Sequence, residues 1–193
     1  MSPTNTQCKK MDGADDSSAP FLLLEVPMDI ELRALSLHAR LAIALTCLER
    51  ICVKKRLIEN DEVQKYLDYM WEYIGLSRAD FDDWCERQAI LVDYGLGYDL
   101  PLDVKNLLDE RGIELPIFHQ LLENTTEILY GSMYTKSDDE GSLLQLQRVM
   151  QLSREFEVAI PDFEIYRFSQ FRDAHGYGRA LTAEELHFWR SKV

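Results

Sequence analysis

The feature that most constrains the fold is an apolar stripe with helical spacing between Leu37 and Cys52. Its members recur at steps of three and four residues: Leu37, Leu41, Ala44, Leu45, Leu48, Ile51 and Cys52. This spacing places them on one face of an α-helix, which other elements must cover. Ser36 can cap the start of this helix, and the basic triplet at 54–56 suits the negative end of its dipole. The stripe therefore predicts a long helix packed within a helical core.

The remaining sequence predicts further helices. We expect them over 61–74, 77–91, 102–112, 116–129, 142–158, 163–171 and 182–192, with loops at 94–98 and 137–141. Thr182 and Glu185 have the spacing of a capping box, which supports the last of these helices. Candidate strands are few and short. The predicted fold class is all-α, a compact multi-helix bundle of about seven to eight helices.

The length of 193 residues suits one domain. Residues 1–20 are small and polar, which predicts a flexible tail, and residues 21–193 are expected to form a single helical domain. The short apolar run at 21–26 could be a strand or an extended segment docked on the helices. No secretory signal or membrane-spanning run is visible, and the four cysteines do not resemble a disulfide framework. A cytoplasmic protein with free thiols is therefore expected.

The negative charge of the chain is concentrated in its middle. Between Glu59 and Glu140 there are 20 acidic and 6 basic residues, a net charge of −14, whereas the rest has 14 acidic and 15 basic residues, a net charge of +1. With a pI of about 4.7, the chain is not expected to bind nucleic acid directly, because that requires clustered Lys and Arg. The acidic segment fits a basic protein partner, with plain solubility as the alternative.

No catalytic or metal-binding motif was found. Glu184 and His187 form one Glu-x-x-His pair without a second copy. Gly95-Leu96-Gly97 lacks the third glycine and the positive surroundings of a phosphate loop, so a tight turn is expected. Acidic neighbours of Cys85 disfavour a reactive thiolate. We therefore expect a non-enzymatic protein with no cofactor and no metal site.

The acidic segment is the candidate partner-binding surface, because carboxylates facing Lys and Arg steer association and select partners. The candidate carboxylates are Asp80, Asp82, Asp83, Glu86, Asp93, Asp99, Asp103, Glu123 and Glu127. Several of them begin helices, where they also stabilise the fold. Tyr94 and Tyr98 are candidate aromatic anchors, and Tyr130 and Tyr134 lie in the same segment. Burial in the core is the alternative for about half of these tyrosines.

The segment Leu-His-Ala-Arg-Leu-Ala-Ile-Ala-Leu-Thr-Cys-Leu-Glu-Arg at 37–50, followed by a second helix, together with small size and acidity, resembles bacterial immunity proteins. These neutralise toxins delivered by type VI secretion or contact-dependent inhibition. The resemblance implies a cytoplasmic inhibitor that binds one cognate toxin and blocks its active site. A basic toxin, such as a nuclease, would match the charge. The resemblance assigns no functional residue.

Two other hypotheses stay open at the level of sequence. Distant carboxylates could assemble into an enzymatic or metal site that no local motif reveals. The chain could also be a helical structural or regulatory module that associates with itself. The sequence does not determine the oligomeric state.

Overall fold

The computed structural model describes residues 31–133 and 137–193. Throughout these two ranges the chain forms α-helices and short 3-10 turns, and its β pairing is confined to one isolated bridge between Leu35 and Gln170. The predicted all-α class is confirmed. The expected tail at 1–20, the apolar run at 21–26 and Tyr134 lie outside the described residues.

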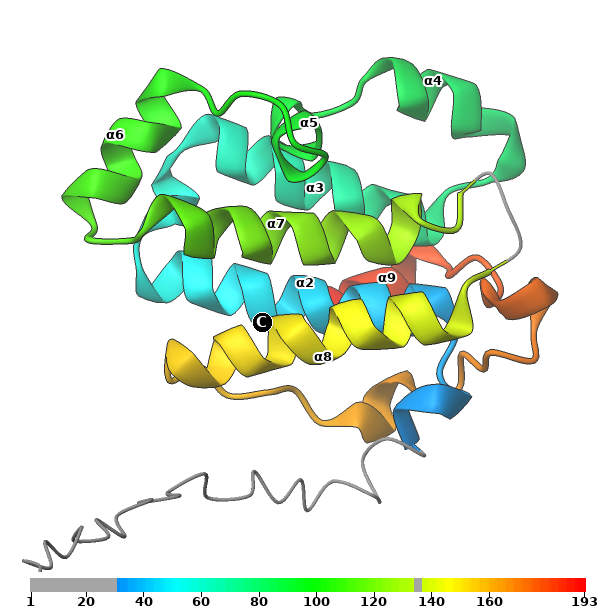
Figure 1. Ribbon diagram of the computed structural model, residues 1–193. Coiled ribbons are helices and arrows are strands. Elements are labelled where there is room, and N and C mark those ends of the chain that lie inside the picture. The colour runs from blue at the N-terminus through cyan, green and yellow to red at the C-terminus, as the bar shows by residue number, and fades with distance from the viewer. Residues whose placement is uncertain (1–30, 134–136) are drawn as a thin grey trace, which may run out of the picture.

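Helix α2 (Leu37–Lys54) runs through the centre of the molecule. Ser36 caps it, as predicted, by accepting a hydrogen bond from the Ala39 backbone N–H at 3.2 Å. Fourteen of its eighteen residues are buried, so the burial extends well beyond the apolar stripe. The helix packs against α3 (Asp61–Gly75), α7 (Leu115–Tyr130), α8 (Asp139–Glu155) and α9 (Ala183–Arg190). The apolar stripe therefore marks the core helix of the bundle (Figure 1).

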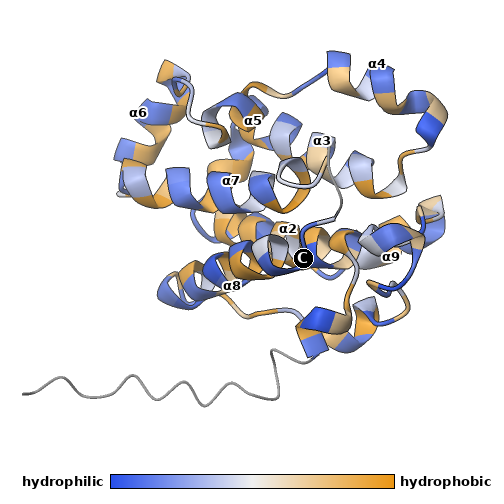
Figure 2. Cartoon of the chain, turned by 45° about the vertical axis from the view of Figure 1, so that its right-hand side comes forward, coloured by the Kyte–Doolittle hydropathy of each residue, from blue (hydrophilic) through white to orange (hydrophobic). Residues whose placement is uncertain are grey.

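Helices α4 (Phe81–Glu86), α5 (Ile90–Gly95) and α6 (Leu102–Glu110) follow one another along one edge of the molecule, beyond α3 and α7. Helices α2, α8 and α9 lie on the other side of α3 and α7 (Figure 1). Hydrophobic and hydrophilic residues alternate along α6, α7 and α8 in Figure 2, as expected for helices with one buried face. Apart from its last residues, which begin α8, the acidic stretch of the sequence thus lies in α3 to α7 and the segments adjoining them.

The single helix expected over 77–91 is wrong. The chain instead forms a 3-10 turn (Arg78–Asp80), then α4, and after an extended residue at Ala89 (ψ 137°) it begins α5. The Trp84 indole is buried against Tyr69 and Tyr73 of α3 and lies near Tyr130 of α7, and α5 packs on α7 and on α3. Periodicity identified the buried residues, but it did not reveal the extended residue at Ala89 that interrupts the helix between them.

Helix α8 also differs from its prediction. The segment at 137–141 is not a loop, because Asp138 caps the helix by accepting a hydrogen bond from the Gly141 N–H at 2.9 Å, and Asp139 and Glu140 lie in the first turn. The helix ends at Glu155, ahead of Pro161. In the stretch expected to be helical over 163–171, only Phe163–Tyr166 forms a 3-10 helix. The capping box of Thr182 and Glu185 at the start of α9 is confirmed.

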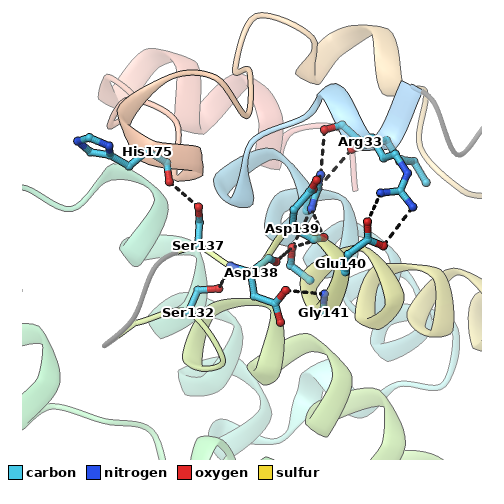
Figure 3. A network of polar contacts seen from close by, with 11 residues as sticks. Arg33, Ser132, Ser137, Asp138, Asp139, Glu140, Gly141 and His175 are labelled. Atoms are coloured by element: carbon cyan, nitrogen blue, oxygen red, sulfur yellow. Dashed lines mark hydrogen bonds and ion pairs between the residues drawn. The ribbon is translucent and has the colours of Figure 1, made fainter.

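Cations on α2 hold the neighbouring segments in place. Arg40 is fully buried, and its guanidinium donates to the Asp139 carboxylate at 2.5 Å and to the Ser142 hydroxyl at 2.8 Å. It also donates to the backbone oxygens of Leu32 at 3.2 Å and Arg33 at 3.0 Å. Figure 3 shows Arg33 facing Glu140 beside Asp139, with the Arg33–Glu140 contacts at 2.5 and 3.1 Å. Arg40 thereby joins the start of α8 to the segment before α2.

The C-terminal half of α2 makes the same use of positive charge. Arg50 donates to the Ala159 carbonyl oxygen at 2.7 Å and to that of Lys192, and Lys54 donates to the Phe156 oxygen at 2.8 Å. These cations satisfy backbone oxygens beyond the end of α8 and at the C-terminus. The C-terminal segment is therefore fixed to the core helix by charge-assisted hydrogen bonds.

Candidate interaction surface

The nine candidate carboxylates lack cationic partners. Across residues 31–133 and 137–193, none of the nine forms an ion pair with a Lys or Arg. Several of them have other polar partners: the Asp80 carboxylate accepts from Ser77 at 2.5 Å, that of Asp93 accepts from Gln88 at 2.6 Å, and that of Glu123 lies 3.8 Å from the His119 imidazole. The Asp103 carboxylate accepts from Asn60 at 3.0 Å, which lowers its pKa. The fold thus forms no direct Lys or Arg ion pair with these nine carboxylates, although Lys65 acts on Asp103 and Arg87 on Asp83 at longer range.

Other carboxylates of the same acidic segment do have cationic partners. Glu72 pairs with Arg87 at 2.8 Å, and Asp68 pairs with Arg190 at 2.5 Å. Asp139 and Glu140 are bound by Arg40 and Arg33. The fold therefore neutralises part of the acidic segment. In the candidate set, Asp93 and Glu127 are half-buried and the other seven carboxylates are exposed.

The candidate set does not form one compact patch. Four members lie on or just before α4, three lie from α5 to the start of α6, and Glu123 and Glu127 lie on α7. Helices α4 and α6 are at opposite ends of the edge in Figure 1. Glu123 lines a separate groove of about 430 Å³ between α7 and α8, together with Arg148 and Glu155. Two candidate groups remain on the α4–α6 edge, and Glu123 faces elsewhere.

Trp84 is the main anchor of helix α4, beside Phe81 and Cys85, which are half-buried against the core. Trp84 is the only buried residue of this helix, and its indole N–H donates to the Tyr69 backbone oxygen at 3.0 Å. Its ring stacks on the Tyr69 ring with centroids 4.1 Å apart and contacts Tyr73 and Phe81. The acidic side chains on both sides of Trp84 in the sequence are therefore held at the surface by an apolar anchor.

The two candidate tyrosines have opposite environments. The Tyr94 side chain is only 6% exposed and packs against Phe118 and His119 of α7, so the expectation that it faces a partner does not fit the fold. Tyr98 is 69% exposed. Tyr94 is buried because its helix, α5, lies very close to α7. At the next residue, Gly95, a Cβ atom would lie only 2.8 Å from the Thr126 hydroxyl of α7. Sequence spacing did not separate the two tyrosines.

Exposed apolar residues beside Tyr98 were missed by the sequence analysis. Leu102 is 71% exposed and Leu96 is also exposed. The loop turns tightly, as expected, with the Leu96 and Tyr98 N–H groups both donating to the Asp93 oxygen at 3.0 Å, and Gly97 has a positive φ of 99°. The available signal was that these apolar residues alternate with Gly, Pro and Asp and lack helical periodicity.

A hollow of about 440 Å³ lies between α6 and the 3-10 turn Leu57–Glu59. It is lined by Glu59, Asn60, Asp103, Asn106, Leu107 and Glu110. Among the acids that line this hollow, Glu59 pairs with Arg111 at 3.5 Å. Asp103 and Glu110 form no ion pair with a Lys or Arg among the described residues. In the part of the chain that the structure describes, no group of three His, Cys, Asp or Glu side chains is arranged to hold a metal ion. The hollow is therefore a negatively charged depression on the protein surface.

The cysteines of α2 lie inside the core. Burial raises the pKa of Cys47 to about 11 and that of Cys52 to about 12, so both remain thiols at neutral pH.

Among the described helices, none combines the length and apolar character needed to cross a membrane. Comparisons with protein-family models, curated proteins and solved structures found no match to this chain.

Proposed function

We propose that this protein is a non-enzymatic binding protein whose α4–α6 region (residues 78–111) associates with a cationic protein partner. The observation that carries the proposal is the absence of any Lys or Arg ion pair at the candidate carboxylates, within the described residues. Folding uses cations for other acids but not for these. Unpaired surface carboxylates repel one another, and a basic partner relieves that repulsion.

The charge of the α4–α6 region supports this proposal. It has nine acidic and four basic residues, a net charge of −5. Two of its four cations, Arg87 and Arg111, are paired with carboxylates outside the region. A surface of this kind accelerates encounter with a basic protein and repels acidic ones.

The immunity-protein hypothesis is the specific form of this proposal. An acidic inhibitor would cover the basic active site of a cognate toxin, such as a nuclease, and the acids on α4 would meet the cations that normally bind substrate phosphates. Neither an enzymatic activity nor self-association is needed for this role.

The test uses the product of the neighbouring gene. We expect it to be a toxin that kills cells, that this chain protects them, and that the two proteins co-purify. Binding should weaken strongly between about 0.1 M and about 1 M salt, where the screening length falls from ~10 Å to ~3 Å. Reversal of charge in the Asp82→Lys/Asp83→Lys variant should weaken it as well. A neighbour without toxicity would refute the immunity role. Tight binding that is insensitive to salt and to charge reversal would refute the electrostatic mechanism.

A further inference from the structure

We infer that the main contact site for the partner is the segment from the end of α5 to the start of α6. Three exposed side chains of this segment, Leu96, Tyr98 and Leu102 (the loop patch), enter an apolar pocket on the partner, and Lys and Arg side chains of the partner surround that pocket. This inference rests on the proposed function and names the contact that supplies its affinity. Charge alone gives fast encounter, whereas buried aromatic and aliphatic anchors supply most of the binding free energy.

The loop patch stands out among the described residues. Of the ten large hydrophobic side chains that are exposed, five lie between Ile90 and Leu115, and its Tyr98 and Leu102 are the most exposed of all ten. Neither residue contributes to the core. Exposed apolar side chains gathered in one short segment and interleaved with acidic residues are typical of interaction sites.

The loop is held in place before any partner arrives. Asp93 accepts two backbone N–H groups of the loop through its carbonyl oxygen, and its carboxylate accepts a hydrogen bond from Gln88 at 2.6 Å. Gln88 in turn accepts from the Tyr130 hydroxyl at 2.8 Å, which lies 3.0 Å from that of Tyr69. This network connects the loop to α7 and α3. A preorganised loop loses little conformational entropy on binding, so the apolar contact is used efficiently.

Charge complementarity identifies the occupant. The loop patch is interleaved with Asp99 and flanked by Asp93 and Asp103, and the region carries a net charge of −5. A second copy of this chain would oppose −5 with −5 across a two-fold interface, which disfavours it. The acidic hollow on α6 begins at Asp103, the residue after Leu102, and its wall can receive a Lys or Arg side chain. The surface therefore fits a basic protein with an apolar pocket.

The test uses the full chain and a displayed library of small globular domains with one randomised surface. We expect the enriched domains to combine Lys or Arg with apolar residues on that surface. Tyr98→Ala should weaken their binding by about 30-fold and Leu102→Ala by about tenfold. Leu144→Ala is the matched control, since Leu144 is an exposed leucine on α8, and should leave binding unchanged. Thermal unfolding should be the same for all three variants.

The outcomes separate this inference from the proposed function. Cationic binders that respond to Asp82→Lys/Asp83→Lys but not to Tyr98→Ala would refute the loop patch as the anchor and leave the proposed function intact. Binders without net positive charge would refute the cationic partner. A dimer of the chain in sedimentation that Tyr98→Ala abolishes would show that a second copy occupies the patch, contrary to the inference. Failure of any domain to enrich would also count against it.

Discussion

The two sides of the bundle use charge in opposite ways. On α2, Arg40, Arg50 and Lys54 are committed to carboxylates and backbone oxygens of the segments that they hold. In the α4–α6 region, carboxylates outnumber cations, and none of the seven candidate carboxylates that lie there forms an ion pair with a Lys or Arg within the described chain. A charge that the fold already uses is unavailable to a partner, whereas an uncompensated one lowers its free energy by association. The first side therefore uses its charge for stability, and the proposed recognition role falls to the second.

Burial differs in parallel with charge. Helix α2 is buried over most of its length, but α4 has a single buried residue, Trp84, and the loop before α6 exposes Tyr98. The core side is held by many contacts, so single exposed changes there should matter little. The α4–α6 side depends on a few buried side chains such as Trp84, so the loss of one of them should matter more.

The Trp84→Ala variant is expected to have the largest effect on stability, because Trp84 is the buried residue that holds α4 to the core. Removing the indole leaves a cavity against Tyr69 and deletes the hydrogen bond to its backbone oxygen, so we expect a loss of about 3–5 kcal/mol in the free energy of unfolding. Urea unfolding measures this loss, and hydrogen exchange should show α4 amides deprotected before those of α2. The exposed Tyr98→Ala variant is the control. A loss below about 1 kcal/mol would show that α4 does not depend on this anchor.

The Arg40→Met variant tests the structural use of charge on the core side. It leaves Asp139 and the Leu32 and Arg33 oxygens without their donor, and we expect a loss of roughly 3 kcal/mol, the low end for a broken buried pair because Asp139 is partly exposed. Chemical denaturation checks the value. Arg33→Gln removes the neighbouring exposed pair and should cost less than about 1 kcal/mol. Equal losses in the two variants would contradict the role assigned to Arg40.

Acidification should weaken the core side through His38. Burial lowers the pKa of this imidazole from 6.5 to about 4, and its Nδ1 lies 3.3 Å from the Arg179 carbonyl oxygen. The folded state therefore keeps His38 neutral, while the unfolded state takes up a proton below pH 6.5. The stabilisation from neutral His38 is complete above that pH and is lost as the pH falls from about 6.5 to about 4.

The matching measurement compares variants at two pH values. Between about pH 7.5 and about pH 5 the wild type should lose about 2 kcal/mol more than His38→Gln does. His187→Gln, a histidine outside the core on α9, should follow the wild type. Parallel losses in wild type and His38→Gln would mean that His38 does not titrate as its burial requires.

The smallest effect is expected where the proposed recognition surface lies. Asp82→Asn/Asp83→Asn should change the free energy of unfolding by less than about 0.5 kcal/mol, because neither carboxylate has an ion-pair partner. Asp139→Asn, the same chemical change on the core side, should cost more because Arg40 loses its partner. Association with a basic protein should show the reverse order, and surface plasmon resonance measures it. A stability loss at Asp82 and Asp83 matching that at Asp139 would remove the distinction between the two sides.

The helical class, the core helix and two helix caps follow from the sequence alone. Apolar spacing and capping residues act over a few positions along the chain, so Ser36 at α2 and Thr182 with Glu185 at α9 were predictable from local sequence. The concentration of acids between Glu59 and Glu140 was equally visible. These properties depend on neighbours in sequence, which a single sequence contains.

Tertiary contacts set which of those residues are buried and which form ion pairs. They divide 77–91 into two helices, bury Tyr94 while exposing Tyr98, and give Asp139 a cation while leaving Asp82 without an ion pair. Each of these outcomes depends on a contact with another part of the chain: Trp84 packs against α3, Tyr94 packs against α7, and Asp139 pairs with Arg40. Burial and ion pairing are contacts in space, and no local pattern specifies which distant surface a side chain will meet.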